Sequence, residues 1–147
     1  MQGKNRVIEL FRTSSRPYYV WAPDYRETSS GVRVLHLLCH ALNSIGEEAY
    51  VTTAVTNPAL RTPTLDRGVV ERHEASDRKP IAVYPEVVSG NPLGAEAVVR
   101  FLLNRPGFLG GDSQFDSAEF VVAYKHEFVT SGVTPRMRLL AQRLNRE

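Results

Sequence analysis

The sequence predicts an α/β fold: a Rossmann-like three-layer α/β/α sandwich with a mostly parallel sheet. Short apolar runs rich in β-branched and aromatic residues alternate with amphipathic segments of helical period. The 147 residues are 42% hydrophobic, enough for one core but not for two full domains. Such alternation favours parallel strands, right-handed crossovers and helices on both faces. We expect residues 1–17 to form an N-terminal arm or helix and residues 18–147 to form the domain.

The first strand and helix have clear boundaries. The aromatic and β-branched run Tyr18–Ala22 stops at Pro23, which predicts a short buried strand. The segment Val32–Ile45 has one broad apolar face and a polar face, the pattern of an amphipathic helix. Gly46 follows its last apolar residue, as a glycine at the C′ position of a helix does.

The middle of the chain predicts two strands around a weaker helix. Glu48–Val55 and Ile81–Tyr84 have strand composition, and Pro85 closes the second of them. Between them we expect a helix at about Leu65–Ala75, although Gly68 lowers its propensity.

The last third predicts a helix, a strand and a terminal helix. Asn91 and Pro92 suit the N-cap and first position of a helix that runs to Arg105, with Glu96 and Arg100 as an exposed i,i+4 pair. A fourth strand is expected at Glu119–Tyr124. Thr134 and Pro135 then open an amphipathic terminal helix, whose apolar residues are Met137, Leu140, Ala141 and Leu144.

Composition narrows the classes of function. The 18 basic and 16 acidic side chains give a net charge of +2, too even for nucleic acid to be the main partner. The basic residues gather near both ends, where they are either solvated or in contact with an anionic surface such as phospholipid headgroups. One cysteine, Cys39, permits no internal disulfide, and no apolar stretch is long enough to span a membrane. We therefore expect a cytoplasmic protein, with peripheral contact at the inner face of the membrane through its basic ends.

The first candidate site is the loop after the first strand. In parallel sheets, ligands bind beyond the carboxyl ends of the strands. Asp24 begins this loop, and Ser29, Ser30 and Gly31 end it at a helix start, where free amides and the helix dipole favour an anion such as a phosphate. The alternative is an ordinary N-cap without a ligand. The glycine-rich fingerprints of dinucleotide-binding and P-loop proteins are absent from the sequence.

Two further candidate sites follow later strands. Glu86 follows the third strand, where its carboxylate can accept a hydrogen bond from a sugar hydroxyl or act as a base, and Gly90 and Asn91 offer amides nearby. Lys125 and His126 follow the fourth strand, and histidine can exchange a proton near neutral pH. The alternatives are a capped helix with a solvated glutamate and a polar strand end.

We expect no metal ion and no cofactor. His36 and His40 have the i,i+4 spacing of a metal-binding pair, but a third ligand is not evident. Cys39 lies between them on the core side of the helix, and packing explains it better than nucleophilic chemistry.

The order of these segments resembles the N-terminal domain of GT-B glycosyltransferases. The stretches that carry the resemblance are Tyr19–Pro23, Ser30–Leu42 and the GEEAYV segment Gly46–Val51. Tyr84–Ala95 and Val99–Gly107 are similar to a subgroup, like family 4 of these enzymes, from bacterial surface-polysaccharide clusters. The resemblance covers residues 18–128.

The resemblance implies a two-domain enzyme that transfers a sugar from a nucleotide-sugar donor to a glycan or lipid-linked acceptor. Its N-terminal domain mostly holds the acceptor, and the loop that matches Ser29, Ser30 and Gly31 lies near the donor diphosphate. His126 is matched with a histidine that contacts the donor sugar in many members. Asp24 or Glu86 is then expected to orient the acceptor hydroxyl, and Lys125, Gly90 and Asn91 to line the ligand-binding cleft.

The second, donor-binding domain of that family has no counterpart in these 147 residues. We therefore expect this chain to be inactive or weakly active alone and to work with a C-terminal domain, a partner chain or a second copy, because transfer requires both substrates to be held together. The alternative is a non-catalytic binding or assembly module with a Rossmann-like fold.

Overall fold

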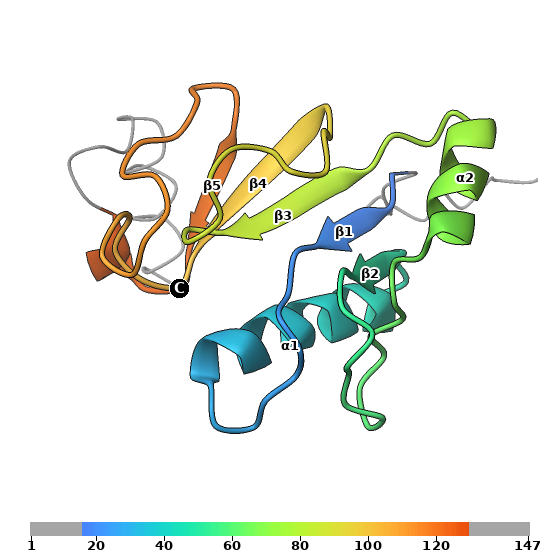
Figure 1. The fold of residues 1–147 in the computed structure, drawn as a ribbon, viewed down its shortest axis with the longest axis horizontal. Helices are drawn as coiled ribbons and strands as arrows, with labels where there is room; N and C mark the ends of the chain where they lie inside the picture. The colour runs from blue at the N-terminus through green and yellow to red at the C-terminus, as the bar shows by residue number, and fades with distance from the viewer. Residues whose placement is uncertain (1–15, 130–147) are drawn as a thin grey trace, which may run out of the picture.

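A five-stranded, all-parallel sheet forms the centre of the computed structural model, which describes residues 16–129 (Figure 1). The strands lie in the order β2-β1-β3-β4-β5, so the chain moves outward from β1 in both directions. The α/β fold predicted from the sequence is confirmed. The predicted terminal helix and all but the last residues of the predicted N-terminal arm lie outside the described residues. The strands are β1 (Tyr18–Val20), β2 (Ala49–Val51), β3 (Ile81–Pro85), β4 (Ala97–Leu102) and β5 (Phe120–Ala123).

Two α-helices begin at side-chain caps that the sequence supplies. In α1 (Ser30–Ser44), the Ser29 hydroxyl accepts the Val32 amide at 3.4 Å, and in α2 (Arg67–Ala75) the Asp66 carboxylate accepts the Val69 amide at 2.8 Å. Gly46 follows α1 with a φ of 93°, which confirms the predicted C′ glycine. A short 3₁₀ helix, η1 (His126–Phe128), follows β5.

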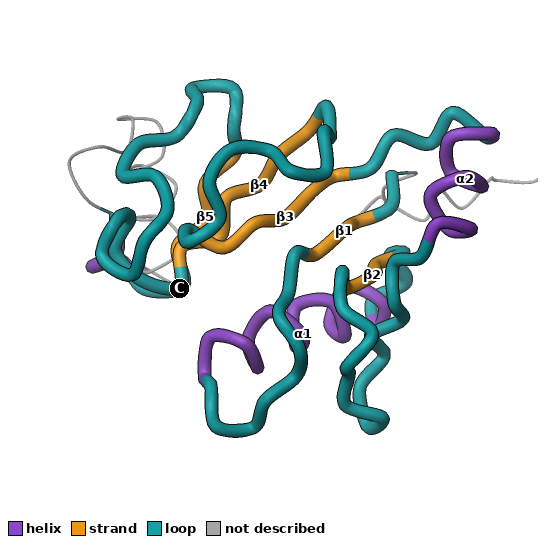
Figure 2. Tube along the Cα trace, viewed as in Figure 1, coloured by secondary structure: helices purple, strands orange, loops and turns teal. Residues whose placement is uncertain are grey.

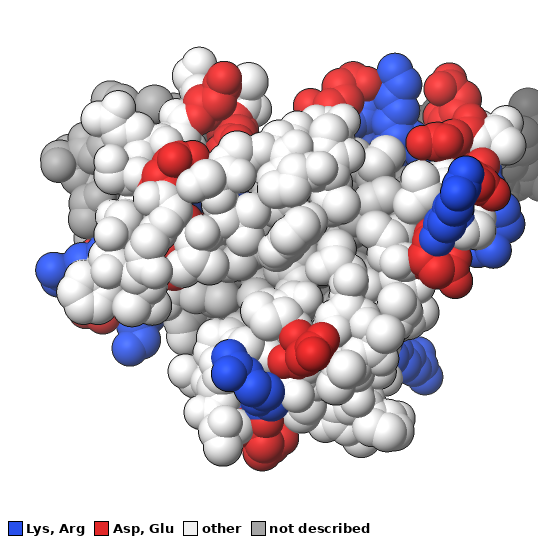
Figure 3. All heavy atoms as spheres, in the orientation of Figure 1, with Lys and Arg blue, Asp and Glu red and all other residues white. Residues whose placement is uncertain are grey.

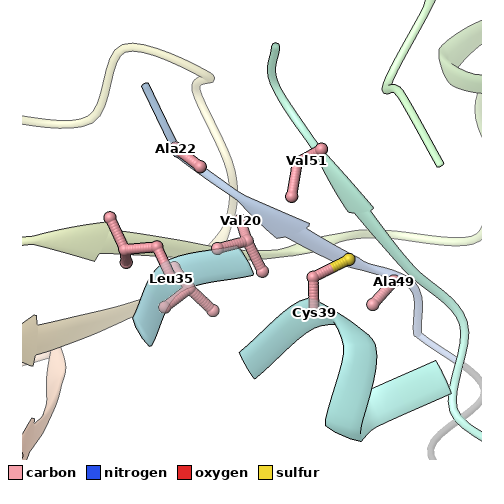
Figure 4. Close-up of a cluster of buried hydrophobic side chains, with 7 residues drawn as sticks. Val20, Ala22, Leu35, Cys39, Ala49 and Val51 are labelled. Carbon is pink, nitrogen blue, oxygen red and sulfur yellow. The ribbon is translucent and has the colours of Figure 1, made fainter. Parts of the chain in front are cut away.

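One face of the sheet packs against α1. Leu35 and Cys39 point from α1 toward Val20 of β1, with Ala49 and Val51 of β2 beside them (Figure 4). These side chains are almost fully buried, which explains why the amphipathic pattern of this helix is so regular. The thiol of Cys39 belongs to this core, as expected, and burial raises its pKa to about 12.

The other face is covered by α2 and by the loops between β3 and β4 and between β4 and β5 (Figure 2). His73 of α2 stacks on Tyr19. The β3–β4 loop packs Leu93 and Ala95 against that face, and Phe115 of the β4–β5 loop lies over Arg100. The three crossovers from β2 to β5 thus lie opposite α1, as right-handed connections require. The result is the predicted three-layer arrangement, with loops and no α-helix in the β3–β4 and β4–β5 connections.

The helix predicted from Pro92 to Arg105 is wrong. Residues 97–102 form strand β4, which pairs in parallel with β3 and β5. Asn91 caps a turn instead of a helix: its side-chain oxygen accepts the Ala95 amide at 3.1 Å, and its amide group donates to the Ala95 carbonyl at 2.8 Å. The β-branched pair before Arg100 was the signal for a strand, and the apparent cap outweighed it in the prediction.

Smaller corrections concern element boundaries. The second strand is shorter than Glu48–Val55, so Thr52 and Thr53 lie beyond its carboxyl end. Glu96 and Arg100 are not an exposed pair, because Glu96 binds Lys79 at 3.0 Å while Arg100 is 1% exposed. Gly94 has a φ of 62° and open space around its Cβ position, so the left-handed turn explains the glycine here.

Candidate functional site

A pocket of about 600 Å³ opens at the carboxyl edge of the sheet. It lies beside the point where the order β2-β1-β3 reverses the direction of the connections, which is where parallel sheets bind ligands. Trp21 and Asp24 come from the loop after β1, Thr52 and Thr53 from the loop after β2, and Leu93 from the β3–β4 loop. The remaining lining residues are Ala22, Pro23, Ala54 and Leu65.

Asp24 is the acidic residue of this pocket. It is exposed, and one of its carboxylate oxygens accepts a short hydrogen bond from the hydroxyl of buried Thr53. Thr53 in turn accepts the Val55 amide at 3.1 Å. The Asp24 carboxylate is therefore fixed on one side by a buried neighbour and still reaches solvent.

The two loops that carry these groups are joined by hydrogen bonds. The Thr52 hydroxyl accepts the Ala22 amide at 3.1 Å and donates to the Ala22 carbonyl at 3.3 Å. Tyr25 donates its amide to the Val55 carbonyl at 2.9 Å. These bonds hold the loops after β1 and β2 side by side, so Asp24 and Thr53 do not depend on a ligand for their positions.

The start of α1 lies at the same edge. Ser29 acts as the N-cap, so the ordinary capping role considered from the sequence is present. Ser30 and Gly31 occupy the first turn, whose amides have no partners within a helix. A Cβ at Gly31 would lie 3.8 Å from the Leu103 side chain, an ordinary contact, so local packing does not require a glycine here.

Glu86 lies at the carboxyl end of β3 but does not face an open cleft. It is 2% exposed, and its carboxylate accepts the Leu103 amide at 2.9 Å, which ties the end of β3 to the end of β4. Gly111 crosses directly over it, since a Cβ there would lie 2.3 Å from the Glu86 carbonyl oxygen. In this structure Glu86 is a buried link between two strand ends.

Gly90 and Asn91 support the fold of the β3–β4 loop. The Gly90 carbonyl accepts Arg100 Nη2 at 2.8 Å, and its amide donates to Asp112 at 3.2 Å. Asn91 accepts the Tyr84 hydroxyl at 2.7 Å. Both residues are exposed and make these local contacts, and their expected place in a ligand-binding cleft stays a prediction.

Lys125 and His126 lie after β5, away from the pocket. Three strand-to-strand steps separate β5 from β1, about 14 Å at the usual spacing. Both residues are exposed, and Lys125 lies 4.0 Å from Glu127 and over the ring of Phe128. The sheet therefore does not bring His126 to Asp24.

The histidines of α1 bind the backbone. His36 Nε2 lies 2.8 Å from the Pro23 carbonyl, and His40 Nδ1 accepts the Arg61 amide at 2.9 Å. Within residues 16–129, no group of three potential ligands is placed to hold a metal ion.

Two polar clusters were missed at the sequence level. Arg100 forms a bidentate pair with Glu119 across β4 and the loop before β5, at 2.8 and 3.2 Å. His73 lies between the Tyr19 hydroxyl at 2.5 Å and the Glu48 carboxylate at 2.8 Å. Both clusters join residues that are far apart in the chain, so only the folded sheet brings them together.

On the face shown in Figure 3, uncharged atoms fill the middle, and charged side chains lie around it. Acidic and basic side chains are interspersed there, in keeping with the small net charge of +2. None of the helices within residues 16–129 combines the length and the apolar character that a membrane crossing requires.

Comparisons with known proteins add no relative. Scans against protein-family models, curated proteins and solved structures each returned no match.

Proposed function

We propose that this chain is the acceptor-side domain of a sugar-nucleotide glycosyltransferase and that the pocket beside Asp24 receives the acceptor saccharide. The observation that carries the proposal is an open pocket of about 600 Å³ at the carboxyl edge, with a fixed carboxylate at its wall. Its volume lies in the range of small-molecule sites. The resemblance to GT-B N-terminal domains supplies the substrate class.

The mixed lining of the pocket supports a saccharide as the ligand. Trp21 and Leu93 offer apolar surface to the C–H face of a sugar ring, and an indole adds a large flat wall. Asp24 and Thr53 offer oxygen atoms to ring hydroxyls. A few polar groups set among apolar walls are what fixes the orientation of a ligand.

In this proposal Asp24 binds the acceptor hydroxyl and acts as the base. In an inverting transfer, its carboxylate takes the hydroxyl proton while the acceptor oxygen forms a bond to the anomeric carbon of the donor. The bond from that carbon to the nucleotide diphosphate breaks, and the diphosphate leaves. In this proposal the amides of Ser30 and Gly31, in the first turn of α1, bind that anion. Buried Glu86 is less suited to the role of base than exposed Asp24.

The donor-binding half belongs to a C-terminal domain or a partner chain in this proposal. We place the protein in the cytoplasm, because its one cysteine is a free, buried thiol, which fits a reducing compartment. Contact of the basic ends with the inner face of the membrane would bring the pocket to a lipid-linked acceptor.

Calorimetric titration tests the proposal with UDP-, GDP- and dTDP-sugars and with a panel of oligosaccharides. We expect an oligosaccharide to bind and Asp24→Asn to weaken its binding about tenfold, the loss of one charge-assisted hydrogen bond. Glu71→Gln, on the exposed side of α2, is the matched control and should bind as the wild type does. Failure of every saccharide and nucleotide-sugar to bind at millimolar concentration would exclude this function.

A further inference from the structure

An apolar groove lies between α1 and the strands on its face of the sheet. Leu38 and Leu42 of α1 form one wall, and Val83, Val99, Phe101 and Val122 form the floor. The groove has a volume of about 150 Å³, and its exposed lining carries no polar surface. An apolar groove on one face of a sheet is usually covered by another element, because exposing apolar surface to water costs free energy.

Topology explains why no other described helix covers this groove. The connections from β2 to β3, β3 to β4 and β4 to β5 all cross on the opposite face, so α1 is the described helix on this one. A segment that returns from β5 toward β1 moves in the same direction as the β1-to-β2 crossover. The right-handed rule therefore sends it over the α1 face.

The sequence after β5 contains a segment suited to this place. Its apolar residues have i, i+3, i+4 and i+7 spacing, and Thr134 and Pro135 are good helix-start residues. Eleven residues from Thr134 would make a helix of about 16 Å, close to the length of a five-residue strand. Val129, the last described residue, follows η1 a few residues after the carboxyl end of β5 and a few residues before Thr134. The apolar residues are Met137, Leu140, Ala141 and Leu144.

We infer that the segment Thr134–Glu147 packs as an amphipathic helix in the apolar groove, beside α1. Its arginines then face solvent, and its apolar stripe covers Phe101 and Val122. The inference is independent of the proposed sugar chemistry.

Thiol cross-linking of the full chain tests the contact. Leu42→Cys and Leu140→Cys are combined in a Cys39→Ala background and treated with a short bismaleimide. We expect a cross-link within one chain, at least fivefold more than for Leu42→Cys with Gln142→Cys, which lies on the opposite side of the predicted helix. A cross-link mainly between two chains would overturn the inference in favour of a second copy. A stronger cross-link from Ile8→Cys would overturn it in favour of the N-terminal segment.

A stability measurement guards against a cross-link formed by chance. Leu140→Asp with Leu144→Asp should lower the Tm of the full chain by about 5–10 °C, because both side chains leave apolar contacts. Gln142→Asp with Arg146→Asp should change it by about 1 °C. Equal effects of the two pairs would overturn the inference.

Discussion

Glu48 binds three side chains through its carboxylate. Its carboxylate accepts Tyr50 at 2.6 Å, His73 at 2.8 Å and Arg78 at 2.6 Å. Burial alone would raise its pKa, but these hydrogen bonds and the charge of Arg78 outweigh it and lower the pKa to about 2. The Tyr19 hydroxyl reaches the same network through His73, and burial, with Tyr50 and Glu48, raises its pKa to about 12.

The lowered pKa of Glu48 predicts a dependence of stability on pH. A carboxyl whose pKa falls on folding stabilises the protein above its ordinary value of 4.5, and this contribution is lost as the pH falls toward 2. Urea unfolding of the wild type and of Glu48→Gln, compared between pH 7 and 2, should show a difference that shrinks below about pH 4.5. Glu71→Gln, which removes a more exposed carboxylate, is the control. A constant difference for Glu48→Gln across that range would contradict the prediction.

Gly111 is the glycine that packing requires. Its φ is 77°, and a Cβ would lie 2.3 Å from the Glu86 carbonyl oxygen and 2.8 Å from the Val87 carbonyl carbon. Both neighbours are backbone atoms and cannot rotate away. The β4–β5 loop can cover the end of β3 only because this position has no side chain.

Replacement of Gly111 by alanine should therefore cost more than its conformation alone explains. Gly94→Ala is the matched control, since its φ of 62° is similar and nothing lies within 4 Å of its Cβ position. We expect about 1–2 kcal/mol for Gly94→Ala and about 2–4 kcal/mol for Gly111→Ala in urea unfolding. Equal costs would show that the loop moves aside freely.

Strand β4 shows how an element can be misassigned from local signals. Asn91 and Pro92 have the residue types of a helix start, and Glu96 and Arg100 have helical spacing. In the fold, Arg100 instead projects from β4 onto the face opposite α1. There it donates to the Val88 and Gly90 carbonyls and lies 5.1 Å from the ring centres of Tyr84 and Phe115.

The pair Arg100–Glu119 should be important for the stability of this element. Its side chains are 1% and 11% exposed, and removal of one partner leaves a buried charge. Glu119→Ala is expected to lower the free energy of unfolding by about 3–5 kcal/mol. Glu127→Ala, which breaks an exposed pair with Lys125, should cost less than about 1 kcal/mol.

A double variant separates the pair from the rest of the loop. Arg100→Met with Glu119→Leu removes both charges and keeps apolar volume, so it should recover most of the loss seen for Glu119→Ala. A double variant as unstable as the single one would mean that the contacts of Arg100 with the carbonyls, not the ion pair, hold the loop.

At the scale of the whole molecule, strand order decides which loops meet. The order β2-β1-β3 places the loops after β1 and β2 next to each other, with Leu93 of the β3–β4 loop at the same pocket. It also separates His126 from that pocket by the width of β3 and β4. The sequence placed three candidate sites after strand ends, at Asp24, Glu86 and His126. In the fold only Asp24 lines the pocket.

Local sequence determined the α/β class, β1, α1 and its caps, and the presence of Asp24 beyond a strand end. These follow from hydrophobic period, capping residues and proline, which act over a few residues. Only the tertiary structure decided that residues 97–102 are a strand, that Glu86 and Arg100 are buried, and that Thr53 holds Asp24. Parallel pairing and burial join residues that are distant in the chain. The free energy gained from these tertiary contacts outweighs local secondary-structure propensity.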